Sequence, residues 1–192
     1  MRDRTIRRLE ERYAVDRDHA RRVERTVLGL FDQVAGPWQL DPDSGGRFLS
    51  WAARLHEVGL AVSHSGYHKH GAYLIAHGDL PGFSRTDRDL LAFLIRTHRR
   101  KITDPLLRTL APGRTRTGLR LSVLLRLAVV LERGRSDQAL PPLELVPRRM
   151  GLELRLPKGW LDDQPLPRTD LANAASLLAA VGFELVVGHF GQ

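Results

Sequence analysis

A chain of 192 residues with 42% hydrophobic side chains can bury a core, and its size suits one domain or one domain with a small appendage. It has no cysteine, which excludes disulfides, thiolate nucleophiles and zinc–thiolate sites. The formal charge of +8 at pH 7 favours an anionic partner, although an arginine-rich composition produces such an excess without any functional demand.

Apolar side chains recur at helical spacing through the first two thirds of the chain, which predicts a bundle of helices. The expected helices span about residues 3–13, 16–34, 47–60, 67–77, 84–101 and 117–132. Asp16 is a predicted N-cap, and Ser84 with Asp87 is predicted to form a capping box. Residues 41–46 are predicted to be a connecting loop.

Three further features of these helices bear on packing. The helix over 117–132 is strongly apolar, which predicts that it lies at the centre of the bundle. Gly59 is expected to allow a close approach between two elements. Arg54 falls outside the apolar stripe of its helix, so it is expected to face solvent or an anion.

Prolines divide the chain after Arg133 into short pieces. Strands are predicted over 143–146, 152–156 and 183–187, with a helix over 171–181. We therefore predict a mainly α protein in which a helical bundle is followed by a small α+β subdomain with an antiparallel sheet. The predicted division is 1–138 for the helical domain and 139–192 for the C-terminal subdomain.

Histidines are concentrated in the middle third of the chain: His56, His64, His68, His70, His77 and His98. The four-residue spacing of His64 and His68, and of Arg96 and Arg100, predicts that each pair shares one helix face. Neutral imidazole binds divalent metals, whereas protonated imidazole donates to phosphate. Both roles stay open from the residues alone, as does a purely structural role in capping loops and packing against aromatic rings.

Residues 55–102, which begin with the Leu-His-Glu sequence and end in Arg-Arg-Lys-Ile, resemble the C-terminal region of the exopolyphosphatase and guanosine pentaphosphate phosphatase family. Residues 4–34, 119–135 and 155–185 are similar to the same region, so the resemblance covers nearly the whole chain. It implies an HD-like helical domain, related to metal-dependent phosphohydrolases, followed by a small mixed domain.

The HD pattern carries over to this chain only in part. His19 and His98, together with His68 or His70, resemble its histidines, and His56-Glu57 takes the place of its His-Asp pair. Glu57 replaces an aspartate, and residues 127–131 supply no final carboxylate. We therefore expect neither catalytic residues nor metal ligands in this chain.

In the family, hydrolysis is attributed to an N-terminal pair of actin-like ATPase-type domains. The resemblance thus implies that this chain is the C-terminal part of a longer enzyme, that it has no cofactor of its own and that the full-length enzyme uses Mg²⁺. We do not expect the chain alone to be catalytic. The preference of the parent enzyme for polyphosphate or for guanosine pentaphosphate is left open.

The function predicted from these observations is binding of inorganic polyphosphate by a homodimer-forming module of an exopolyphosphatase. The candidate phosphate-binding residues are Lys69, His70, Arg96, Arg99, Arg100 and Lys101. No run of eighteen apolar residues and no secretory signal occurs, so we expect a cytoplasmic protein without a membrane partner.

Two alternatives remain. One is an autonomous HD-type metal-dependent phosphohydrolase, which the histidine cluster favours. The other is a nucleic-acid-binding protein, which the positive charge favours. The second is not expected, because the sequence has few aromatic residues for stacking and no recognition motif.

Overall fold

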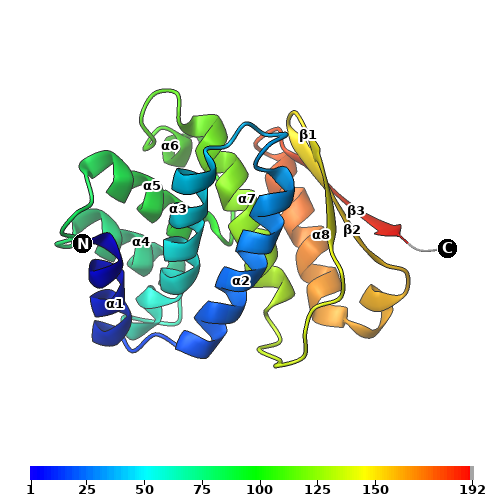
Figure 1. The fold of residues 1–192 in the computed structure, drawn as a ribbon, viewed down its shortest axis with the longest axis horizontal. Helices are drawn as coiled ribbons and strands as arrows, with labels where there is room; N and C mark the ends of the chain where they lie inside the picture. Colours follow the sequence, from blue (N-terminus) through cyan, green and yellow to red (C-terminus); the bar gives the residue numbers. More distant parts are fainter. Residues whose placement is uncertain (191–192) are drawn as a thin grey trace.

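The computed structural model describes residues 1–190, and helices make up most of it (Figure 1). The helical part comprises α1 (Arg2–Arg12), α2 (Arg17–Val34), α3 (Pro42–Leu55), the 3₁₀ helix η1 (Val58–Ala61), α4 (Tyr67–His77), α5 (Arg85–Thr97), α6 (Asp104–Leu107) and α7 (Thr115–Leu131). The C-terminal part comprises β1 (Glu144–Arg148), β2 (Gly151–Pro157), the 3₁₀ helix η2 (Trp160–Asp163), α8 (Pro165–Ala179) and β3 (Glu184–Phe190). The predicted class, a mainly α bundle followed by a small α+β part, is confirmed.

The apolar helix α7 lies at the centre of the bundle, as predicted. It packs against α2, α3 and α5 on the bundle side and against α8 on the other. Residues 118–128 of α7 are all buried, including Arg120 and Arg126, so the helix carries two arginines into the interior.

The sheet has the strand order β1-β2-β3. β1 and β2 are antiparallel, as predicted, but β2 and β3 are parallel, so the prediction of a purely antiparallel sheet was wrong. The reason is that α8 connects β2 to β3, and a helical crossover returns the chain in the same direction. Figure 1 shows α8 between this sheet and α7.

Helix α3 begins at Pro42, five residues before its predicted start, so the loop expected over 41–46 is mostly the first turn of this helix. The carboxylate of Asp41 accepts a hydrogen bond from the backbone N–H of Ser44 at 2.7 Å, and Pro42 takes the first helical position. Glycine at 45 allows α3 to pack closely on α2, because a Cβ there would lie only 2.8 Å from the Phe31 ring. The cap and the packing together outweigh the low helix propensity of the glycine pair.

Neither of the two residue pairs that were predicted to share a helix face does so. His64 lies before the start of α4, so it does not share a helix with His68. Arg100 lies beyond the end of α5 with a φ of 66°, so it does not continue the face of Arg96.

Helix α8 also starts earlier than expected, at Pro165, because proline is compatible with the first turn of a helix.

The helical part and the sheet share one core. Trp38, which follows α2, donates from Nε1 to the carbonyl of Arg148 at 2.9 Å and packs edge-on against Phe183, with ring centroids 6.2 Å apart. The predicted division at residue 138 stays a prediction. None of the helices in residues 1–190 combines the length and apolarity needed to cross a membrane.

Candidate functional site

A cavity of about 530 Å³ lies where the bundle meets α8. Its lining comes from α2, the start of α4, α7 and α8, and from the segments that follow α3, α5 and α7. Five arginines and two carboxylates line it: Arg99, Arg100, Arg126, Arg133, Arg135, Glu57 and Asp170. With histidines neutral, these residues give the cavity a net formal charge of +3.

Both carboxylates of the cavity are already paired with arginine. Arg135 donates to Glu57 at 2.6 Å and to Asp16 at 2.8 Å, and Arg133 forms an ion pair with Asp170. The acidic groups therefore neutralise two of the five lining arginines, and the other three have no carboxylate partner among residues 1–190.

Arg126 is the most deeply buried of these arginines, with 2% of its surface exposed. One terminal nitrogen donates to the carbonyls of Thr97 at 2.6 Å and Arg100 at 2.5 Å, while the buried Nε has no hydrogen-bond partner in the described part of the chain. Burial lowers the pKa of the Arg126 guanidinium to about 10, so the group stays charged at neutral pH. No carboxylate of residues 1–190 lies within ion-pair distance of it.

Buried histidines lie beside the cavity. His56 and His98 each donate from Nδ1 to a backbone carbonyl at 2.7 Å, those of Ala53 and Ile95. This hydrogen bond fixes the tautomer and leaves the Nε2 lone pair free. Nε2 of His98 accepts from the Tyr67 hydroxyl at 3.3 Å, whereas the buried Nε2 of His56 has no partner.

All four buried histidines are held in the neutral form. Burial is the main cause, and it lowers the pKa of His19 and of His68 to about 4. The pKa of His56 is lowered by burial as well, and that of His98 lies well below the usual value for the same reason. The cluster therefore adds no positive charge to the cavity at neutral pH.

Donor atoms of His19, His56 and Glu57 all lie within 4.8 Å of one another, close enough to hold a metal ion. The free lone pair on His56 suits a transition metal, but two imidazoles do not suit Mg²⁺, which prefers oxygen ligands. Arg135 already neutralises Glu57, so a transition metal would have to displace this guanidinium from the carboxylate. These residues therefore do not fit Mg²⁺.

The sequence profile of the family described as "Ppx/GppA phosphatase, domain III" matches residues 1–175. The chain belongs to this family. It is also 35% identical, over 188 residues, to a guanosine-5'-triphosphate,3'-diphosphate pyrophosphatase from Photobacterium profundum. That match covers 97% of this chain and 37% of the relative, so the chain spans little more than a third of the relative's length. The resemblance stated from the sequence is confirmed.

Four of the predicted phosphate-binding residues lie together in this Ppx/GppA domain III. Lys69 and Arg96 lie on the packed helices α4 and α5, Arg99 and Arg100 follow α5, and all four are close enough to His68 to lower its pKa. Arg99, whose guanidinium lies 4.9 Å from the centre of the Tyr67 ring, and Arg100 also line the cavity.

The other two members of the predicted set lie outside the cavity lining. His70 is half-buried on α4, and Lys101 is exposed after α5. That all six residues bind phosphate stays a prediction.

Sequence reasoning missed Arg126, Arg133 and Arg135. The signal for Arg126 was present, because an arginine within the otherwise apolar run 123–131 interrupts the pattern of a buried helix. The roles of Arg133 and Arg135 depend on contacts with distant residues, Asp170 and Glu57, and left no local pattern.

Proposed function

We propose that this chain is the C-terminal, polyphosphate-binding module of an exopolyphosphatase. In the full-length protein, an active site in the N-terminal domains would remove terminal phosphate from inorganic polyphosphate, with Mg²⁺ bound there. Membership of the Ppx/GppA family supports the parent activity. The cationic lining of the cavity, beside a histidine cluster that does not fit Mg²⁺ and whose carboxylate is paired with Arg135, supports a binding role for this part of the protein.

The observation that carries the proposal is the group of cations around His68. Lys69 lies on α4, Arg96 on the last turn of the neighbouring α5, and Arg99 and Arg100 directly after it, and all four lower the pKa of this histidine. A phosphate chain carries roughly one charge per unit, and arginine forks and lysine ammonium groups bind phosphate oxygens through charge-assisted hydrogen bonds. Several such contacts in a row would hold a chain better than a single phosphate.

The test is a binding titration of the purified chain with long and short polyphosphate, at roughly 50 and 200 mM salt. We expect long chains to bind more tightly, because more contacts form, and binding to weaken steeply at the higher salt concentration. We also expect no release of phosphate in the presence of Mg²⁺. Binding that does not depend on chain length would contradict the proposal.

Variants locate the binding surface. The double substitution Lys69→Gln with Arg96→Gln is expected to weaken long-chain binding roughly tenfold and to reduce the salt dependence. Its matched control is Arg4→Gln with Arg8→Gln, which removes the same charge from exposed positions on α1. If both pairs weaken binding equally, overall charge and not this surface is responsible.

An autonomous HD-type phosphohydrolase is the competing function, and the His19–His56–Glu57 cluster is what favours it. It requires stoichiometric metal and turnover that is lost in His56→Ala. We propose the binding function instead because Arg135 neutralises the carboxylate of this cluster.

We further propose that the module forms a homodimer and acts in the cytoplasm. Both rest on the family resemblance and on the sequence features described above. Sedimentation equilibrium of the purified chain tests the first, since a monomer at micromolar concentration would contradict it.

A further inference from the structure

Arg126 is a buried charge whose counter-ion is missing from the described part of the chain. It is 2% exposed, its Nε has no hydrogen-bond partner, and its terminal nitrogen meets only carbonyl oxygens. The carbonyls of Thr97 and Arg100, at and just beyond the end of α5, offer partial negative charge. They satisfy hydrogen bonds, but they do not neutralise a full positive charge in a low-dielectric interior.

The surroundings add to this excess of charge. Arg99 and Arg100 line the same cavity, and neither has a carboxylate partner within residues 1–190. The volume of about 530 Å³ lies in the range that small-molecule sites occupy. Three uncompensated positive charges thus face a space large enough for a ligand.

We propose that this cavity is a receptor for a compact anion with a short chain of phosphates, anchored by Arg126 and held by Arg99, Arg100 and Arg133. This site deepens the proposed function, because it takes the same class of ligand as the surface around His68. It differs from that surface in having the deeply buried Arg126 in its lining, so we expect it to bind a short chain or a chain end.

Arg135 explains why phosphate would bind here without a metal bridge. Its guanidinium occupies the carboxylate that, with His19 and His56, would otherwise complete a divalent cation site. The guanidinium of Arg135 then occupies the position in which an exchangeable metal ion would bind Glu57. The cavity can bind an anion directly through its arginines.

The test uses isothermal titration of inorganic tripolyphosphate into the purified chain, with chelator present to remove divalent metals. We expect one binding site per chain. Arg133→Gln, which changes a half-exposed side chain, is expected to weaken binding roughly tenfold. Arg126→Met is expected to abolish it, and circular dichroism shows whether that variant is folded.

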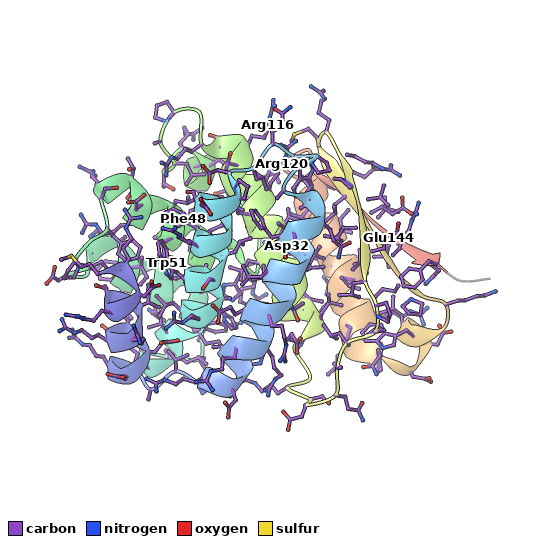
Figure 2. All side chains as sticks on the ribbon, viewed as in Figure 1. Asp32, Phe48, Trp51, Arg116, Arg120 and Glu144 are labelled. Carbon is purple, nitrogen blue, oxygen red and sulfur yellow. The ribbon has the colours of Figure 1, made fainter. Side chains whose placement is uncertain are left out.

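The matched control is Arg116→Gln, because Arg116 is exposed near the start of α7 (Figure 2), whereas the residues of α7 that line the cavity begin at Arg126. It removes the same charge and is expected to leave the affinity unchanged. Equal weakening by Arg116→Gln and Arg133→Gln would overturn the proposal, and so would the absence of tripolyphosphate binding. Stoichiometric uptake of Co²⁺ by the unaltered chain, lost in His56→Ala, would also overturn it.

This proposal rests on the proposed function, and two further comparisons distinguish them. One compares binding at the cavity with binding at the surface around His68, and the other identifies the ligand of the cavity. Loss of long-chain binding in Lys69→Gln with Arg96→Gln, with tripolyphosphate binding intact, separates the surface from the cavity. GTP and tripolyphosphate carry phosphate chains of the same length. Tighter binding of GTP would assign the cavity to nucleotides, and equal or weaker binding would assign it to inorganic phosphate chains.

Discussion

The guanidinium of Arg135 donates to Oε1 of Glu57 at 2.6 Å, although the two residues are 78 positions apart in the chain. The same guanidinium donates to Asp16, and the backbone of Arg135 adopts a left-handed conformation with a φ of 50°. One side chain thereby joins the start of α2, the segment after α3 and the segment after α7. All three segments meet at the cavity, so its charge and its shape depend on this contact.

The first prediction concerns the charge of Glu57. Glu57→Gln raises the net formal charge of the cavity lining from +3 to +4 and leaves Arg135 with Asp16 as its one ion-pair partner among residues 1–190. We expect tripolyphosphate to bind several-fold more tightly, about 1 kcal/mol, because one repulsive charge is removed. Calorimetric titration at constant salt measures this, with Glu11→Gln on the exposed face of α1 as control. A loss of affinity would instead indicate that Glu57 serves the ligand or a metal.

The helical part of the fold could be predicted well because its signals are local. Ser84 and Asp87 form the predicted capping box, with the Ser84 hydroxyl and the Asp87 carboxylate each accepting from the other's backbone. Gly59 permits the predicted close approach, since a Cβ there would lie 2.0 Å from the carbonyl of Tyr67. Both features depend on residues a few positions apart or on the size of one side chain.

The site was harder to predict because its contacts are not local. The direction of β3 depends on where α8 packs, and the cavity depends on pairs such as Arg133 with Asp170. No periodicity in the sequence encodes such pairs. The histidines were found from the sequence, but burial, which sets their protonation, appears only once α2, α3 and α5 are packed.

The second prediction concerns Arg54, which was expected to face solvent or an anion and instead forms a two-pronged ion pair with Glu10, at 2.8 and 2.6 Å. Only 7% of the Glu10 side chain and 17% of the Arg54 side chain are exposed. Arg54→Met leaves a buried carboxylate without a partner, so we expect the free energy of unfolding to fall by about 3 kcal/mol.

Urea denaturation measures this change. The double variant Glu10→Leu with Arg54→Met should recover most of the loss, because no charge is then left buried. Breaking the exposed pair with Arg17→Met should cost less than about 1 kcal/mol. A double variant as unstable as Arg54→Met alone would show that packing, not charge, dominates at this position.

The third prediction compares two glycines. A Cβ on Gly59 would lie 2.0 Å from the carbonyl oxygen of Tyr67 and 2.5 Å from the backbone nitrogen of Gly71, so Gly59→Ala must push η1 away from α4. We expect a loss of about 1–3 kcal/mol in the free energy of unfolding. Gly29 lies exposed within α2 with no atom in reach of its Cβ, so Gly29→Ala should stabilise by about 1 kcal/mol. Equal effects of the two substitutions would contradict the packing of η1 against α4.

The last prediction concerns pH. The pKa of His19 and of His68 is about 4 in the folded chain, against 6.5 for a free histidine, so between these values the unfolded chain binds more protons. The free energy of unfolding must therefore rise with pH through this window and decline as the pH falls from 6.5 toward 4. The midpoints of urea denaturation at about pH 7.5 and pH 5 measure this decline in stability. Both pH values lie above the range in which most carboxylates titrate.

Two histidine variants test whether this decline comes from the buried cluster. His68→Gln should reduce the difference between the two midpoints, because it removes one of the groups that cause it. His64→Gln, at an exposed position, should leave the difference as it is in the unaltered chain. An unchanged difference in His68→Gln would mean that His68 is protonated in the folded state, in which case it would belong to the cationic group that surrounds it.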